Sequence, residues 1–195
     1  MIRPNDIFMD MSGSVVDQLR ESNRQIINDV VLSLGLTSTT EAIADANKLG
    51  STITIANGDY GGFLCKNAGS IYKGIGAASK VTKPVTIDAD CIIDGVYFTG
   101  GSGLPGNLVS ISVGCVVVFR NCVFEKISGD GGSYVSLAPP VGAVVAKANL
   151  IGCVFQGPNS GAVVNNPGAA ANVNTIGCYD RTGGGFAGTT GVGNL

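Results

Sequence analysis

The chain has 195 residues, of which 45% are hydrophobic and only 13% charged, and its 30 glycines are about twice the usual share. A formal net charge of −2 with no run of Lys or Arg lacks the footprint of nucleic-acid binding. The absence of His and Trp removes the commonest general base and the usual sugar-stacking side chain. No apolar run is long enough to cross a bilayer, so the sequence predicts a folded β-rich domain with neither nucleic acid nor membrane as a partner.

Residues 1–36 are predicted to form an N-terminal α-helical arm, in which Ser12 or Ser14 caps the helix and Gly35 ends it. Apolar positions at three- and four-residue spacing, with one polar residue among them, form a two-heptad coiled-coil seam: Val16, Leu19, Asn23, Ile26 and Val30. This seam favours self-association. A wider apolar face, with Ile27, Val31 and Leu34, equally favours docking on the chain's own domain, and both readings stay open. The first residues lack the regions of a signal peptide, which predicts synthesis in the cytoplasm without processing.

Residues 37–50 are predicted to form a capping helix. Thr39 or Thr40 supplies the cap, Ala42, Ile43 and Ala46 face one way, and Gly50 ends the helix directly before a strand. A short helix in this place protects the open edge of the β structure that follows in residues 51–195.

An internal repeat underlies residues 51–180. Four segments align as IIDGVYF, FRNCVF, LIGCVF and TIGCYD, with steps of 26, 31 and 25 residues between Gly95, Asn121, Gly152 and Gly177. Self-similarity at this period indicates a solenoid, and the short β-branched runs VTI, VSISV, CVVVF and AVVA make it an all-β parallel solenoid. Asn121, with Asn149 and Asn174 as further candidates, is predicted to lie at tight bends, as are the three aligned glycines.

Equivalent positions of successive rungs stack in such a solenoid, so the alignment predicts two ladders of core side chains. One consists of Cys122, Cys153 and Cys178, and the other of Phe98, Phe124 and Phe155. The six cysteines show no CxxC pair, so we expect reduced, buried thiols rather than a metal site or disulfides. No cofactor is predicted.

The candidate catalytic residues are Asp88, Asp90 and Asp94, because polysaccharide hydrolysis requires two carboxylates about 5 to 10 Å apart. Asp88 and Asp90, two apart on a predicted strand, would project to the same side, with Glu125 or Asp130 of the next rung close by. The alternative is that these residues lie on the solvated outer surface of the solenoid and take no part in catalysis. The carboxylates recur in no second rung, so the sequence favours a protein that is not an enzyme.

The C-terminal third has an unusually uncharged composition. Residues 131–195 hold three charges, Lys147, Asp180 and Arg181. Because interface cores are depleted of charge, we interpret this stretch as packed against other copies or a partner; a buried Gly-rich domain with uncharged loops is the alternative.

The run TTEAIADANKLGSTITIANGDYGGFL, residues 39–64, resembles the opening of the pectate-lyase-like superfamily of right-handed parallel β-helices, which includes bacteriophage tailspikes and other virion proteins. KPVTIDADCIIDGVYF, residues 83–98, is similar to a rung of that family, and the likeness extends over about residues 39–180. The resemblance implies a right-handed coil. For a lyase it would also imply a calcium site and a basic residue, for which Lys83 and Arg120 are candidates.

The resembled family includes lyases, glycosidases and noncatalytic scaffolds, so the resemblance does not choose among these functions. The small size of five or six predicted rungs, the missing catalytic chemistry and the uneven charge lead to the hypothesis of a structural virion protein of a bacteriophage, a capsid cement or decoration protein. We expect it to assemble in the host cytoplasm as a homotrimer, although a dimer stays open, and to contact the major capsid protein or another virion protein. The alternative is a small tailspike or tail-fibre adhesin that binds or cleaves host surface polysaccharide through the wall of Asp88, Asp90 and Asp94. A free lyase-like enzyme is a third reading.

Overall fold

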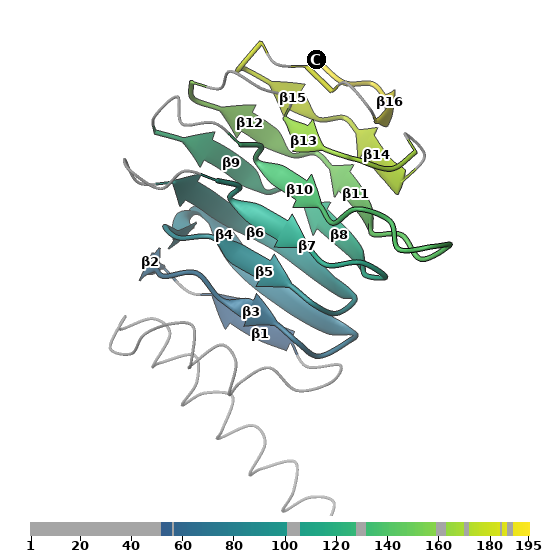
Figure 1. Ribbon diagram of the computed structural model, residues 1–195. Helices are drawn as coiled ribbons and strands as arrows, with labels where there is room; N and C mark the ends of the chain where they lie inside the picture. Colours follow the sequence, from purple (N-terminus) through teal and green to yellow (C-terminus); the bar gives the residue numbers. More distant parts are fainter. Residues whose placement is uncertain are drawn as a thin grey trace, which may run out of the picture.

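Parallel β-strands dominate the computed structural model, which describes residues 52–55, 57–100, 106–127, 132–158, 163–169, 172–183, 185–186 and 189–195 (Figure 1). The strands among these residues are β1 (Thr52–Ile55), β2 (Gly58–Tyr60), β3 (Leu64–Cys65), β4 (Ser70–Val81), β5 (Val85–Ile87), β6 (Cys91–Gly100), β7 (Val109–Ile111), β8 (Val116–Arg120), β9 (Val123–Lys126), β10 (Val135–Leu137), β11 (Lys147–Ile151), β12 (Val154–Gln156), β13 (Val164–Asn165), β14 (Val173–Ile176), β15 (Tyr179–Asp180) and β16 (Thr190–Val192). The predicted arm (1–36), its seam and the capping helix (37–50) lie outside the described residues.

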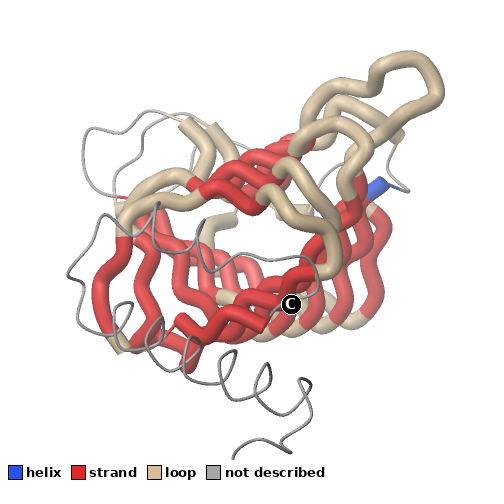
Figure 2. Tube along the Cα trace, turned by 90° about the horizontal axis from the view of Figure 1, so that it is seen from below, coloured by secondary structure: helices blue, strands red, loops and turns tan. Residues whose placement is uncertain are grey.

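Two curled sheets enclose the core. The large sheet has eleven strands and contains β6, β8, β9, β11 and β12, while the small sheet has five, in the order β13-β10-β7-β5-β3. Every strand pairing within them is parallel, and the small sheet faces the bent large sheet across the interior (Figure 2). This arrangement confirms the predicted all-β, parallel architecture.

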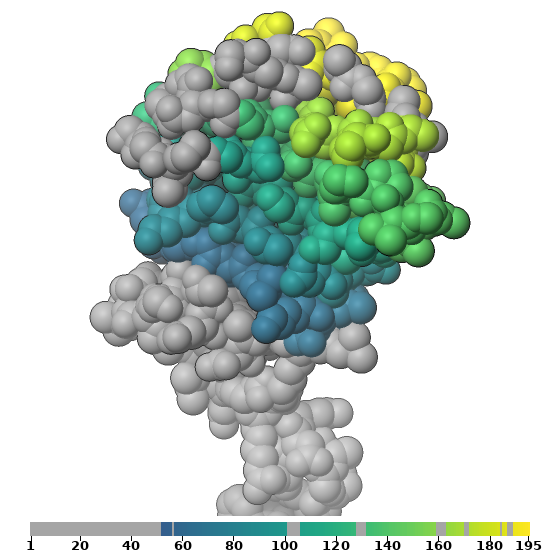
Figure 3. Space-filling view, viewed as in Figure 1, coloured from purple at the N-terminus to yellow at the C-terminus, as the bar shows by residue number. Residues whose placement is uncertain are grey.

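The chain visits the two sheets in turn, so its successive passages stack as coils. One coil runs through β7 of the small sheet and then β8 and β9 of the large sheet, and the next runs through β10, β11 and β12. Strands of neighbouring coils pair with each other, as β8 does with β11 and β9 with β12. The bands of colour in Figure 3 follow this order from one end of the stack to the other. The fold is therefore solenoid-like.

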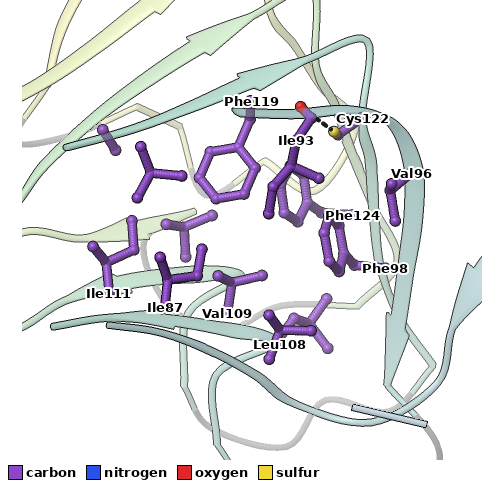
Figure 4. Packing of buried hydrophobic residues seen from close by; sticks show 14 of the residues in the cluster. Ile87, Ile93, Val96, Phe98, Leu108, Val109, Ile111, Phe119, Cys122 and Phe124 are labelled. Atoms are coloured by element: carbon purple, nitrogen blue, oxygen red, sulfur yellow. Dashed lines mark hydrogen bonds between the residues drawn. The ribbon is translucent and has the colours of Figure 1, made fainter. Parts of the chain in front are cut away.

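Alternating side chains fill the interior between the sheets (Figure 4). In β8, for example, Val117 and Phe119 are buried while Val116 and Arg120 are exposed, as expected for a strand with one face toward a core. Phe98, Phe124 and Phe155 stack one above another, with ring centroids 5.0 and 4.9 Å apart and interplanar angles of 12° and 6°. Burial of each such side chain stabilises the fold by about 1.5–3 kcal/mol.

A second inward row becomes smaller toward the C-terminal coils. Its members, in register on β4, β6, β8, β11, β14 and β16, are Tyr72, Ile93, Phe119, Leu150, Thr175 and Gly191. A Cβ atom on Gly191 would lie 2.6 Å from Thr175 Oγ1 and closer still to Asn194 Nδ2. A side chain at position 191 would therefore require the side chains of Asn194 and Thr175 to move.

Each coil bends within the large sheet at one corner residue. Gly95, Asn121, Gly152 and Gly177 occupy this corner with φ values of 66°, 51°, 61° and 59°, which confirms the prediction that these aligned residues lie at bends. The further prediction for Asn149 and Asn174 was wrong, because both lie in strands, β11 and β14. There the Asn174 amide donates to Asn149 Oδ1 at 3.0 Å, so the two asparagines link neighbouring coils.

The run AVVA, predicted as a strand, is also outside the regular strands. Val141 and Val144 form an isolated antiparallel bridge, and β11 begins at Lys147. Two prolines precede this turn and Gly142 within it has a φ of 60°, a combination that reverses the chain instead of extending it.

Candidate functional site

The predicted acidic cluster is divided between a bend and a strand. Asp88 and Asp90 lie in the bend between β5 and β6, on either side of the buried Ala89, and Asp94 lies within β6. The prediction that Asp88 and Asp90 share a strand was therefore wrong. The alternation of burial nevertheless continues through the bend: Ile87, Ala89 and Cys91 are buried, and Asp88 and Asp90 are both exposed.

Each of the three carboxylates accepts a hydrogen bond from the following coil. Ser112 Oγ donates to Asp88 Oδ1, the Val116 amide donates to Asp90 Oδ1 at 2.7 Å, and Asn121 Nδ2 donates to Asp94 Oδ1 at 3.2 Å. Charge-assisted bonds of this kind hold one coil against the next.

The other residues nominated for a polysaccharide site are dispersed. Arg120 is beside Asp94 in the register of β6 and β8. Glu125 is on β9, where it contacts Tyr97 and Gln156 instead of the acidic cluster. Asp130 lies outside the described residues. Lys83 and Asp88 both line a hollow of about 470 Å³ that also includes Pro84 and Thr86.

That hollow lies on the outer face of the small sheet, where a row of polar side chains follows the stack. Thr86, Ser110, Ser136 and Asn165 are in register from β5 to β13, and Asn165 Nδ2 donates to Ser136 Oγ at 3.1 Å. A second hollow of about 330 Å³ contains the last three of them. The row offers hydroxyl and amide groups to a polar ligand, with one cation and one carboxylate at the N-terminal end.

The cysteine ladder is buried in the core. The structure places Cys122, Cys153 and Cys178 one residue after successive corner positions, and each thiol donates to a carbonyl of the preceding coil, the Cys178 thiol to Leu150 O at 3.3 Å. The side-chain contact with Cys122, together with burial, raises the pKa of the Cys153 thiol, and contact with Cys153 does the same for Cys178. A thiol kept protonated in this way is a poor nucleophile.

A second thiol cluster was not predicted. Contact with Cys65, followed by burial, raises the pKa of Cys91, and burial followed by Cys65 raises that of Tyr72. Cys65 and Cys91 face each other from different sheets, so linear spacing gives no sign of their meeting. All six cysteines are free and buried. Among the described residues, no group of three or more His, Cys, Asp or Glu side chains could hold a metal ion.

Aromatic, aliphatic and polar side chains lie together on the outer face of β6, β9, β12 and β15. Its central line, here named the outer row, consists of residues in register: Tyr97, Val123, Val154 and Tyr179. Tyr97 Oη donates to Glu125 Oε2, and Gln156 Nε2 donates to Glu125 Oε1 at 3.2 Å. Burial, and then the bond to Glu125, raise the pKa of Tyr97 to about 12.

Sequence reasoning did not single out the outer row, although the aligned repeats contain it. Each member of the outer row comes two residues after the corner residue of its coil. Val123, for example, follows Cys122 and precedes Phe124 of the aromatic ladder. In the last repeat Asp180 replaces the aromatic residue, and Phe186 packs edge-on against Phe155 instead, with centroids 5.7 Å apart.

Comparison of the chain with protein-family models, with curated proteins and with solved structures finds no match in any of the three. Within the part of the chain that the structure describes, no helix has the length and apolarity to span a membrane.

Proposed function

We propose that the solenoid-like fold is a short right-handed parallel β-helix and that the chain is a structural protein of a bacteriophage virion, a capsid cement or decoration protein. In this role it assembles in the host cytoplasm, joins the virion, and contacts the major capsid protein or another virion protein. The resemblance to the pectate-lyase-like superfamily supports the virion setting and the expectation of a homotrimer.

One observation carries the mechanical role. Asp88, Asp90 and Asp94, the acidic candidates for cleavage, each accept a hydrogen bond from the next coil. These carboxylates therefore hold neighbouring coils of the stack together. Together with the stacked rings of Phe98, Phe124 and Phe155, these bonds make a block that resists shear between coils.

The test uses shells purified from virions that lack the protein. We expect such shells to lose resistance to heat or low salt, and the added full-length chain to restore it. A chain without residues 1–36 serves as the matched control and should not restore resistance, because we propose that this arm attaches the protein to the shell. Shells whose resistance is the same with and without the protein would contradict the cement role.

A second candidate function is adhesion to host surface polysaccharide. The hollow that Lys83 and Asp88 share with Thr86, and its continuation along the polar row of the small sheet, favour this alternative. It predicts that isolated host polysaccharide binds to the full chain in calorimetry and that Asp88→Asn with Asp90→Asn weakens binding. Absence of heat from the wild-type chain at millimolar glycan would exclude it.

A further inference from the structure

The cysteine ladder places three thiols on neighbouring coils of the stack. Cys122, Cys153 and Cys178 each follow a corner residue directly. The Val154 amide donates to Cys122 O and the Tyr179 amide donates to Cys153 O, both at 2.9 Å, so successive members of the ladder are neighbours across the parallel pairing. Paired parallel strands lie about 4.8 Å apart, and this spacing is within the range of roughly 4.4–6.8 Å between the Cα atoms of disulfide-bonded cysteines. Each neighbouring pair is thus close enough for a disulfide.

The directions of the side chains also bring the thiols together. All three cysteines are buried, so their side chains point into the same interior. Cys153 Sγ donates to Phe119 O at 3.7 Å, and Cys178 Sγ donates to Leu150 O at 3.3 Å. Each of these carbonyl groups belongs to the coil of the preceding cysteine. Each thiol is therefore directed toward the coil that holds its neighbour, and the structure, in which all six cysteines are free, shows the reduced form.

The two ends of the ladder differ in their exposure. One coil before Cys122, the residue after the corner is Val96, which is fully buried. One coil after Cys178 it is Asn194, which is half-buried and whose Oδ1 accepts a hydrogen bond from the Cys178 amide at 3.0 Å. Strand β16, just before Asn194, is exposed at all three of its residues. A local opening of the stack in this region therefore uncovers Cys178 before the other two thiols.

We propose that a peroxide oxidises the ladder to a disulfide between Cys153 and Cys178, which locks their two coils together. In the first step Cys178 Sγ attacks hydrogen peroxide: an S–O bond forms, the O–O bond breaks, and the thiol proton leaves with the released oxygen as water. The sulfenic acid at Cys178 then returns into the ladder. In the second step Cys153 Sγ attacks Cys178 Sγ: the S–S bond forms, the S–O bond breaks, and the hydroxyl group leaves with the Cys153 proton as water. The two thiols lose two electrons, and the peroxide is reduced to two water molecules.

Burial keeps the ladder reduced while the coils are closed. Contact with Cys153, followed by burial, raises the pKa of the Cys178 thiol, so the closed stack holds this thiol in its unreactive protonated form. Opening removes both causes and makes the thiolate accessible. Cys122 keeps its thiol, because Cys153 can form only one disulfide and the neighbour of Cys122 on its other side is Val96.

The inference rests on the proposed function only for the occasion of the oxidation. The cytoplasm keeps thiols reduced, whereas a virion that leaves its host enters oxidising surroundings. A chain that is folded and assembled in the reduced form would then gain a covalent link between coils after release. The chemistry itself belongs to the single chain and is tested on it alone.

The test treats the full chain with hydrogen peroxide, alkylates the remaining thiols in urea and identifies the tryptic peptides by mass spectrometry. Peptide 148–181 contains both Cys153 and Cys178, whereas peptide 121–126 contains Cys122. We expect peptide 148–181 to lose two hydrogen atoms and to carry no alkyl group, while peptide 121–126 is alkylated. A cross-link between the two peptides, or alkylated or oxygen-bearing cysteines in peptide 148–181, would overturn the proposal.

Two variants test the choice of pair. Cys122→Ala is the matched control, because it changes the same ladder one coil away and should leave the bond between Cys153 and Cys178 unaffected. In Cys153→Ala the nearest ladder thiol to Cys178 is two coils away, so peptide 148–181 should be alkylated or oxidised at Cys178 without forming a disulfide. A control variant that loses the bond would contradict this pairing.

The locking effect is measured as the rate of unfolding in urea. The oxidised wild type should unfold at least about tenfold more slowly than the reduced chain, and dithiothreitol should remove the difference, because the disulfide restricts the chain between the two coils. Oxidised Cys153→Ala should gain nothing. Equal rates for the oxidised and reduced wild type, or slower unfolding that persists in Cys153→Ala, would overturn the lock.

The outcomes for the two proposals are separable. A disulfide that forms and slows unfolding, together with shells whose resistance does not depend on the protein, would contradict the cement role and leave the disulfide standing. Shells that require the protein, together with a peptide 148–181 that remains alkylated at both cysteines, would overturn this inference alone.

Discussion

Asn121 is the one residue other than glycine with a positive φ among the residues that the structure describes. Its side-chain amide is bonded to Asp94 of the preceding coil, so it combines a corner conformation with a link between coils. Glycine occupies the same corner in the neighbouring coils, at positions 95, 152 and 177. Asparagine is among the few residue types that adopt this backbone conformation without a large penalty.

Substitution at Asn121 separates these two contributions. Asn121→Gly keeps the backbone conformation and loses the hydrogen bond, whereas Asn121→Val also strains the backbone. We expect the valine variant to have a free energy of unfolding about 1–2 kcal/mol below that of the glycine variant, measured by urea denaturation. Equal midpoints for the two variants would contradict this account.

Tyr97 makes stability depend on pH in the alkaline range. The unfolded side chain ionises near pH 10, whereas the folded one keeps its proton until about pH 12 because of burial and its bond to Glu125. Between these values the unfolded state binds fewer protons, so the contribution of Tyr97 is complete below pH 10 and falls as the pH rises through this window. Tyr97→Phe should decline less steeply than the wild type in chemical denaturation from about pH 9 to 12. Parallel curves would show that the shift has no effect on stability.

At the scale of the elements, the aromatic ladder joins three successive coils. Phe124 is in the middle, stacked on Phe98 and Phe155 and edge-on to Phe119. We expect Phe124→Ala to cost about 3–5 kcal/mol, because a cavity forms between coils that cannot collapse independently. Phe186→Ala should cost clearly less, since Phe186 is only partly buried and meets the ladder at its end. Similar losses in thermal unfolding of the two variants would contradict a continuous ladder.

The sequence repeat predicted the positions that recur in the aligned segments of successive coils. The alignment placed Asn121 and Gly152 at corners and brought Phe124 to the level of Phe155, because residues in register share one environment in every coil. The positions of Asp88 and Asp90 could not be predicted in this way. The aligned segments begin at Ile92, so the repeat includes neither these two residues nor their hydrogen-bond partners in the next coil, Ser112 and Val116.

At the scale of the whole molecule, one core extends through all the coils. Among the residues that the structure describes, one buried cluster extends from Ile53 to Cys178 and includes side chains of both sheets. We therefore expect a chain that lacks residues 1–36 to fold, with an unchanged β signal in circular dichroism and a single cooperative unfolding transition. Loss of the β signal would show that the arm is part of the core, which is the docking alternative for its apolar face.

The inward row from Tyr72 to Gly191 makes each coil specific to its level in the stack. Although the coils share a backbone plan, an exchange of two of them would bring Phe119 to the level of Thr175, where the space is small, and leave a void where the ring had been. Genetic duplication of a coil would meet the same obstacle. If this array arose by copying one unit, later divergence has since fixed the order of its units, and a longer version requires new side chains at every junction instead of one more copy.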